Sequence, residues 1–223
     1  MKELPIGIQT FRKIIEGGYV YADKTRYIYN LLKGSYYYFL SRPRRFGKSL
    51  LIDTIAEVFS GDRELFRGLW IYNSDYSFQK HPIIRLDMTQ LETGDADSLK
   101  KTLNERLEEF AEAEGIQFNS EFLSSRFRAL ILGLHKKYDE RVVVLVDEYD
   151  SPVLDHITEA ATADDNRTVI KNFFRILKGL DAHLQFVFFT GVSKFTKTSL
   201  FSELNNLQDI TMSDDYANIC GFT

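Results

Sequence analysis

The fold is decided by one stretch, YYYFLSRPRRFGKS at residues 36–49. An aromatic and apolar run at 36–40 predicts a strand, and the residues after Ser49 show the apolar spacing of a helix. A strand and a helix joined by a loop that ends in Gly47-Lys48-Ser49 form the context in which a loop binds the phosphates of a nucleotide. We therefore expect a phosphate-binding loop at this point.

The residue types of this loop suit the chemistry of ATP with magnesium. Backbone N–H groups and the positive end of the helix dipole favour phosphate oxygens. Lys48 is predicted to reach the β- and γ-phosphates, and the Ser49 hydroxyl is predicted to coordinate Mg²⁺. Further nucleotide contacts are predicted for the neighbouring residues Arg45, Phe46, Gly47 and Leu50.

The loop departs from the pattern G-x-x-x-x-G-K-[ST] at its first position, which Arg42 occupies. Pro43 makes the entry to the loop stiff, where a glycine would make it permissive. Because a bare Gly-Lys-Ser is frequent, an ordinary helix start is the alternative interpretation. We expect Arg42 to pair with acidic side chains, whereas Arg44 and Arg45 could pair likewise or contact phosphate or nucleic acid.

A second candidate feature is the acidic end of the strand predicted at 142–146. Asp147 follows that strand and is expected to bind Mg²⁺ beside the strand of the phosphate loop, in the manner of a Walker B aspartate. Glu148 is expected to act on the attacking water. Adjacent strand residues point in opposite directions, so Glu148 reaches the γ-phosphate only if the backbone turns there.

Asp150 is assigned a structural role, because Ser151 as a cap and Pro152 at the first helical position are typical of a helix start. The alternative is a metal-nuclease site made by Asp147, Glu148 and Asp150. No matched basic residue accompanies these three carboxylates, and Gly-Lys-Ser favours a nucleotide site. The nuclease interpretation is therefore the minor one.

The strand predicted at 185–190 ends in a hydroxyl residue, Thr190. A polar residue at this place can sense the γ-phosphate, so Thr190 is included with Glu148 in the predicted catalytic set. Ser193 is the second choice for the sensor. The alternative for both is an ordinary strand-end hydroxyl.

Short apolar runs alternate along the chain with longer helical patterns, which indicates an α/β fold. We predict a three-layer αβα P-loop NTPase domain with a mainly parallel five-stranded sheet. Residues 1–35 would form an N-terminal lead laid against the sheet edge, and 36–223 the core. The strands are predicted at 36–40, 83–87, 142–146, 185–190 and 209–212.

Composition supports a soluble globular protein, with 44% hydrophobic and 27% charged residues in a chain of 223. The net charge of −4 gives no general affinity for nucleic acid or anionic membranes. The start of the chain lacks the pattern of a signal peptide, and no apolar run is long enough to span a bilayer. A single cysteine, Cys220, suits a reducing compartment. We predict a cytoplasmic protein with no membrane partner.

Five stretches resemble the bacterial AAA-ATPase-like family and together cover nearly the whole chain: residues 4–9, 21–25, 39–50, 190–195 and 199–207. The resemblance implies that the altered first loop position is the family's own version. It carries over Lys48 and Ser49 as phosphate and Mg²⁺ contacts, and Asp147 and Glu148 as Walker B residues. Many members continue into a PD-(D/E)XK nuclease-like domain, so such a domain, or nucleic acid bound through it, is the implied partner.

The chain stops at Thr223, soon after the last predicted strand. A lid over the nucleotide and a nuclease-like domain would lie beyond that point, so we expect an N-terminal fragment without them. The leading prediction is a nucleoside triphosphate hydrolase that uses ATP to drive or gate an attached or partner effector. The alternatives are a nucleotide-responsive binding module without useful turnover and a nucleic-acid-remodelling ATPase. The oligomeric state and the base preference stay open.

Overall fold

The computed structural model describes residues 2–192 and 206–221, which are built around a five-stranded sheet of order β2-β3-β4-β1-β5. All of the pairings between these strands are parallel. The predicted α/β class with a mainly parallel five-stranded sheet is therefore confirmed. The strands are β1 (Tyr37–Ser41), β2 (Ile83–Asp87), β3 (Val142–Asp147), β4 (Leu184–Gly191) and β5 (Gln208–Asp209).

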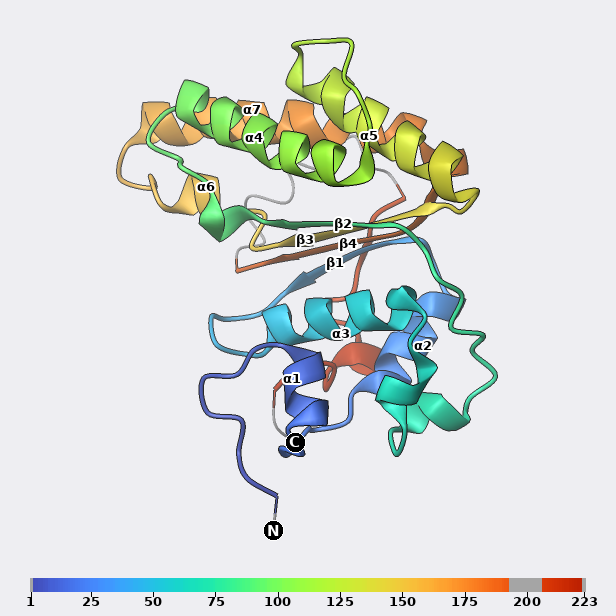
Figure 1. Ribbon diagram of the computed structural model, residues 1–223. Coiled ribbons are helices and arrows are strands. Elements are labelled where there is room, and N and C mark those ends of the chain that lie inside the picture. The colour runs from blue at the N-terminus through green and yellow to red at the C-terminus, as the bar shows by residue number, and fades with distance from the viewer. Residues whose placement is uncertain (1, 193–205, 222–223) are drawn as a thin grey trace.

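Two layers of helices enclose the sheet, as Figure 1 shows, and this confirms the predicted three-layer architecture. One layer holds α1 (Phe11–Glu16), α2 (Thr25–Lys33) and α3 (Lys48–Ser60). The other holds α4 (Ala96–Glu114), α5 (Leu123–Tyr138), α6 (Ser151–Leu154) and α7 (Ala160–Arg175). Short 3-10 turns occur at Arg63–Phe66, Trp70–Asn73, Met88–Gln90, Ile176–Gly179, Asp181–His183 and Asp214–Tyr216. None of the helices in the described part of the chain combines the length and apolarity needed to cross a bilayer.

Successive residues of the central strands face opposite helical layers. In β3, Val142, Val144 and Val146 belong to the core shared with α4, α5 and α7, whereas Val143 and Leu145 belong to the core shared with α3. All five side chains are fully buried. Burial on both faces explains why these strands read as nearly continuous apolar runs in the sequence.

The position of β4 differs from one sequence-based prediction. We expected the strand that ends at Asp147 to lie next to β1, but β4 lies between β1 and β3 and pairs with both. Parallel strands are joined by crossovers through helices, so sequence order does not fix which strands become neighbours. Because all the strands run in one direction, Ser41, Asp147 and Gly191 end β1, β3 and β4 at the same edge of the sheet.

The last strand is shorter and begins earlier than the predicted 209–212, because β5 covers only Gln208–Asp209. The Asp209 carboxylate accepts a hydrogen bond from the Thr211 N–H at 2.9 Å. This local turn ends the strand. The Thr211 hydroxyl then accepts the Ser41 N–H at 3.0 Å, which holds the C-terminal segment beside the end of β1.

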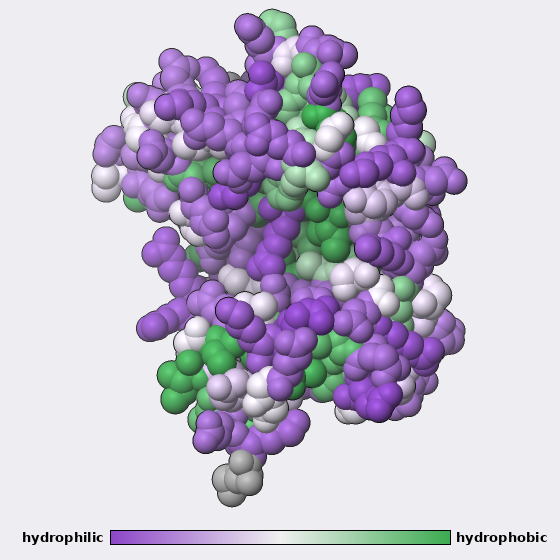
Figure 2. Space-filling model, in the orientation of Figure 1, coloured by the Kyte–Doolittle hydropathy of each residue, from purple (hydrophilic) through white to green (hydrophobic). Residues whose placement is uncertain are grey.

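The N-terminal lead forms part of a helical layer, so the prediction that it lies against the sheet edge is wrong. Helix α1 packs on α3, and Phe11 shares a buried core with Tyr38 of β1. Such large apolar side chains are buried more completely between a helix and a sheet face than at an edge. Figure 2 shows further apolar side chains gathered on the surface over the lead, where Leu4 and Ile6 are exposed.

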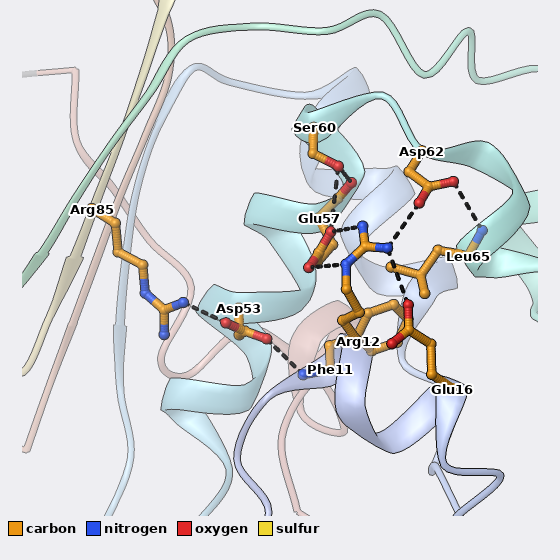
Figure 3. Close-up of polar contacts among 9 residues, drawn as sticks. All are labelled: Phe11, Arg12, Glu16, Asp53, Glu57, Ser60, Asp62, Leu65 and Arg85. Carbon is orange, nitrogen blue, oxygen red and sulfur yellow. Dashed lines mark hydrogen bonds and ion pairs between the residues drawn. The ribbon is translucent and has the colours of Figure 1, made fainter. Parts of the chain in front are cut away.

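Polar contacts fasten the lead to α3, as Figure 3 shows. The Asp53 carboxylate accepts the N–H of Phe11 at 2.6 Å and also pairs with the Arg85 guanidinium of β2. Arg12 donates two hydrogen bonds to the Glu57 carboxylate, at 2.7 and 3.1 Å. These hydrogen bonds from Arg12 to Glu57 are the largest cause that raises the pKa of Arg12 above its ordinary value. The lead and α3 are thus joined by charged groups as well as by apolar packing.

Replacing Asp53 with Ala is expected to lower the free energy of unfolding by about 2 kcal/mol. The change leaves the Phe11 N–H and the Arg85 guanidinium without their acceptor at a position where Asp53 is buried. Urea denaturation monitored by circular dichroism measures the loss. Asp97→Ala is the control, because that side chain is 92% exposed and pairs with Lys100 on its own helix. Equal losses in the two variants would contradict the proposed clamp.

Candidate functional site

The loop between β1 and α3 is curled by two residues with left-handed backbones. Arg45 has φ 68° and Gly47 has φ 86°, a conformation that glycine adopts without strain. Gly47 is the N-cap residue of α3, and it provides no side-chain hydrogen bond to the helix. The first N–H groups of α3 therefore have no capping side chain. An anion is the acceptor that the helix dipole favours at this place.

Arg42 fixes the entry to the loop through backbone oxygens. Its guanidinium donates to the carbonyls of Ser41 at 3.0 Å, Thr211 at 2.6 Å and Tyr216 at 3.3 Å. The prediction that Arg42 pairs with acidic side chains is therefore wrong, because the C-terminal segment places carbonyls beside it. An arginine at the first loop position thus ties the loop to that segment, where glycine would leave it loose.

Lys48 is buried at the start of α3, with 3% of its surface exposed. Its ammonium donates to the carbonyls of Arg42 and Pro43 at 3.0 and 3.1 Å, and it forms an ion pair with Glu148 at 3.1 Å. The lysine side chain therefore folds back across its own loop. These contacts bring the loop and the acidic end of β3 together.

The acidic end of β3 is organised by Thr190 of β4. The Thr190 hydroxyl donates a short hydrogen bond to the Asp147 carboxylate and accepts the Glu148 N–H at 3.2 Å. Thr190 is completely buried, and Asp147 is 3% exposed. The hydroxyl predicted to sense a phosphate therefore orients Asp147 in this structure.

The backbone turns at Glu148, as its use in a nucleotide site required. Glu148 has φ 52°, in the left-handed region, and its side chain pairs with Lys48 while Asp147 pairs with Thr190. The turn lies directly before α6, whose first residue is Ser151. Two adjacent carboxylates thus serve different partners.

Asp150 has a structural role, in agreement with the sequence. It is fully buried, and its carboxylate accepts the Val192 N–H at 3.0 and 3.3 Å. The predicted cap at Ser151 is wrong by one position, because α6 begins there and Asp150 is the N-cap residue. Within residues 2–192 and 206–221, no three metal-ligating side chains gather at one point. This argues against the alternative metal-nuclease site in that part of the chain.

A family profile described as "Predicted AAA-ATPase" matches residues 5–201, which is most of the chain. The chain belongs to the AAA-ATPase-like family. An Azotobacter chroococcum mcd 1 protein described as "Uncharacterized protein in vnfD 5'region" is similar to it, with 46% identity over 224 residues. The match covers 100% of this chain and 43% of the relative, so the chain spans less than half of that relative's length.

This AAA-ATPase-like chain brings most of the predicted site residues to one edge of the sheet. Lys48 and Ser49 begin α3, and Asp147 and Glu148 end β3, so the Lys48–Glu148 ion pair joins the two elements that carry them. The predicted nucleotide contacts Arg45, Phe46, Gly47 and Leu50 lie in the same loop and in the first turn of α3. Ser193, the second choice for a sensor, lies outside the described residues.

Sequence reasoning missed the C-terminal segment of the site. Residues Ala217 to Gly221 line one cavity together with Phe46, Gly47 and residues of the lead. A Cβ atom on Gly221 would lie 3.7 Å from the Phe46 ring, so the segment passes directly over the AAA-ATPase-like loop. The glycine at 221, with φ 83°, was the one sequence signal for this close approach.

Proposed function

We propose that this AAA-ATPase-like chain binds ATP with Mg²⁺ and hydrolyses it to drive or gate an attached or partner effector. The observation that carries the proposal is the Lys48–Glu148 ion pair between the uncapped start of α3 and the end of β3. One contact places a buried cation at a phosphate-binding helix start and a carboxylate within reach of the same phosphate.

The phosphates would lie over the first turn of α3. The N–H groups of that turn and the loop backbone at Arg45, Phe46, Gly47 and Leu50 would donate to phosphate oxygens. The Lys48 ammonium already lies among acceptors, because two carbonyls and one carboxylate surround it. A γ-phosphate carries more negative charge than one carboxylate, so it would take Lys48 from Glu148.

The residues present fit a magnesium ion. Mg²⁺ prefers oxygen ligands and is held in nucleotide sites by one or two side chains together with phosphates and water. The Ser49 hydroxyl and the Asp147 carboxylate are such ligands, and Thr190 already fixes the orientation of Asp147. When bound, the ion neutralises charge on the phosphates.

Glu148 would act as the general base once Lys48 has moved to the phosphates. A water oxygen bonds to the γ-phosphorus, its proton passes to the Glu148 carboxylate, and the bond to the bridging oxygen breaks to release ADP and phosphate. The left-handed turn aims Glu148 toward the loop, where such a water would lie. Thr190 would contribute by holding Asp147 and the Glu148 backbone.

Calorimetry with MgATP, followed by a steady-state phosphate-release assay, tests this function. Binding with turnover supports the proposal, and binding without turnover identifies a nucleotide-responsive binding module. Turnover that DNA or RNA stimulates, with strongly salt-dependent binding, identifies a nucleic-acid-remodelling ATPase. A nuclease-like domain, or nucleic acid bound through it, rests on resemblance alone and stays a prediction.

A further inference from the structure

A cavity of about 540 Å³ opens beside the phosphate loop. Three separate segments form its walls: the lead, the loop with the first turn of α3, and the C-terminal segment. Figure 1 shows the blue lead passing in front of α3, with the chain's C-terminal end beside α1. The residues that matter most are Val20 and Tyr21 of the lead, Phe46 and Leu50, and Ile219 and Cys220.

We propose that this cavity binds the base of the nucleotide, with adenine preferred over guanine, and that the lead is therefore part of the nucleotide site. This inference rests on the proposed function, because it places the base of a nucleotide whose phosphates lie on the same loop.

The walls suit a flat aromatic ring. Val20, Leu50 and Ile219 are apolar, and the volume falls within the range of ordinary small-molecule sites. Phe46 is 47% exposed although it is a large aromatic residue. An exposed aromatic side chain that lines a cavity can stack against a nucleobase, an interaction that tolerates any base and adds binding energy.

The lead is held firmly enough to serve as a wall. The Tyr21 ring packs edge-on against Phe11 with centroids 5.0 Å apart, and its hydroxyl hydrogen-bonds the Thr54 hydroxyl of α3 at 3.3 Å. The Asp53 and Arg12 contacts in Figure 3 fix α1 to the same helix. The phosphate loop and the cavity wall are thus attached to one element, α3.

The polar residues of the cavity favour adenine. Lys24, Arg45 and Asn218 supply hydrogen-bond donors, and the described residues that line the cavity include no aspartate or glutamate. Adenine offers ring-nitrogen acceptors to such donors. Guanine carries adjacent N–H groups that a carboxylate would satisfy, and leaving them unpaired on burial weakens binding.

Calorimetry with MgATP, MgGTP and magnesium tripolyphosphate tests the inference, because tripolyphosphate has phosphates but no base. Ala217→Trp fills the cavity from an exposed lining residue whose helical backbone accepts any side chain. MgATP affinity is expected to fall at least fivefold in this variant, while tripolyphosphate affinity stays unchanged. Ala113→Trp, at an exposed position of α4, should change neither affinity. In the wild type, MgATP should bind at least fivefold more tightly than MgGTP.

Cys220 provides a second measurement, because it is the chain's only cysteine and lines the cavity. Burial raises the pKa of its thiol to about 11, so alkylation by N-ethylmaleimide at pH 8 is slow but specific to this site. MgATP should slow the reaction at least threefold, whereas magnesium tripolyphosphate should leave the rate unchanged.

The outcomes separate the two proposals. If tripolyphosphate binds but Ala217→Trp leaves MgATP affinity unchanged, or if both ligands protect Cys220 equally, the base lies elsewhere and the phosphate site stands. Equal affinity for MgGTP and MgATP overturns the preference for adenine. If the wild type binds none of the three ligands, the proposed function fails and this inference fails with it.

Discussion

Replacing Glu148 with Gln is expected to reduce phosphate release at least a hundredfold while MgATP binds no more weakly than to the wild type. The amide keeps the size of the side chain but cannot accept a proton from water, and general-base catalysis contributes about 10²–10⁴ in rate. A steady-state phosphate-release assay measures the first effect, and calorimetry measures the second.

The structure explains why affinity should not fall in this variant. Glu148 holds Lys48 at 3.1 Å when no phosphate is present, so the carboxylate competes with ATP for the ammonium. A neutral amide competes less. Glu64→Gln serves as the control, because Glu64 pairs with Arg67 on the exposed surface. If wild-type turnover does not exceed that of Glu148→Gln, the hydrolase assignment fails and the binding module replaces it.

Replacing Lys48 with Ala is expected to weaken MgATP binding at least thirtyfold, which corresponds to about 2 kcal/mol. Lys48 is the buried cation at the start of α3, and truncating one partner of a buried charge pair is costly for binding. The same change leaves Glu148, whose side chain is 18% exposed, free to turn toward solvent. Calorimetry measures the affinity of the folded variant.

Lys33→Ala is the matched control, because Lys33 lies on the surface of α2 and pairs with Asp75. It should bind MgATP like the wild type. Equal affinities in Lys48→Ala and the wild type would remove the phosphate-loop assignment, whatever the result for Glu148.

Much of the fold could be predicted because its strands are buried on both faces. The run at 142–146 needs no tertiary information to predict a strand, and β3 extends it by one residue to Asp147. The position of β4 between β1 and β3 could not be predicted, because it depends on which apolar faces pack together after long crossovers. Gln208–Asp209 was placed poorly because a side-chain hydrogen bond from Asp209 ends the strand.

The site was predictable where a motif is local and unpredictable where partners are distant in sequence. Gly47, Lys48 and Ser49 follow one another, and the helix start at Ser151 suggested the turn at Glu148. The partners of Arg42 and Thr190 come from segments more than forty residues away, such as Thr211 and Asp147. Backbone carbonyls, which Arg42 binds, leave no trace in a sequence.

The left-handed backbone at Glu148 also bears on how this position evolves. A residue with a Cβ atom is disfavoured by about 1 kcal/mol in that conformation, and glycine would relieve the strain. Selection for folding alone would therefore drift this site toward glycine or asparagine. A glutamate kept against that drift marks a position at which natural selection has valued chemistry above stability.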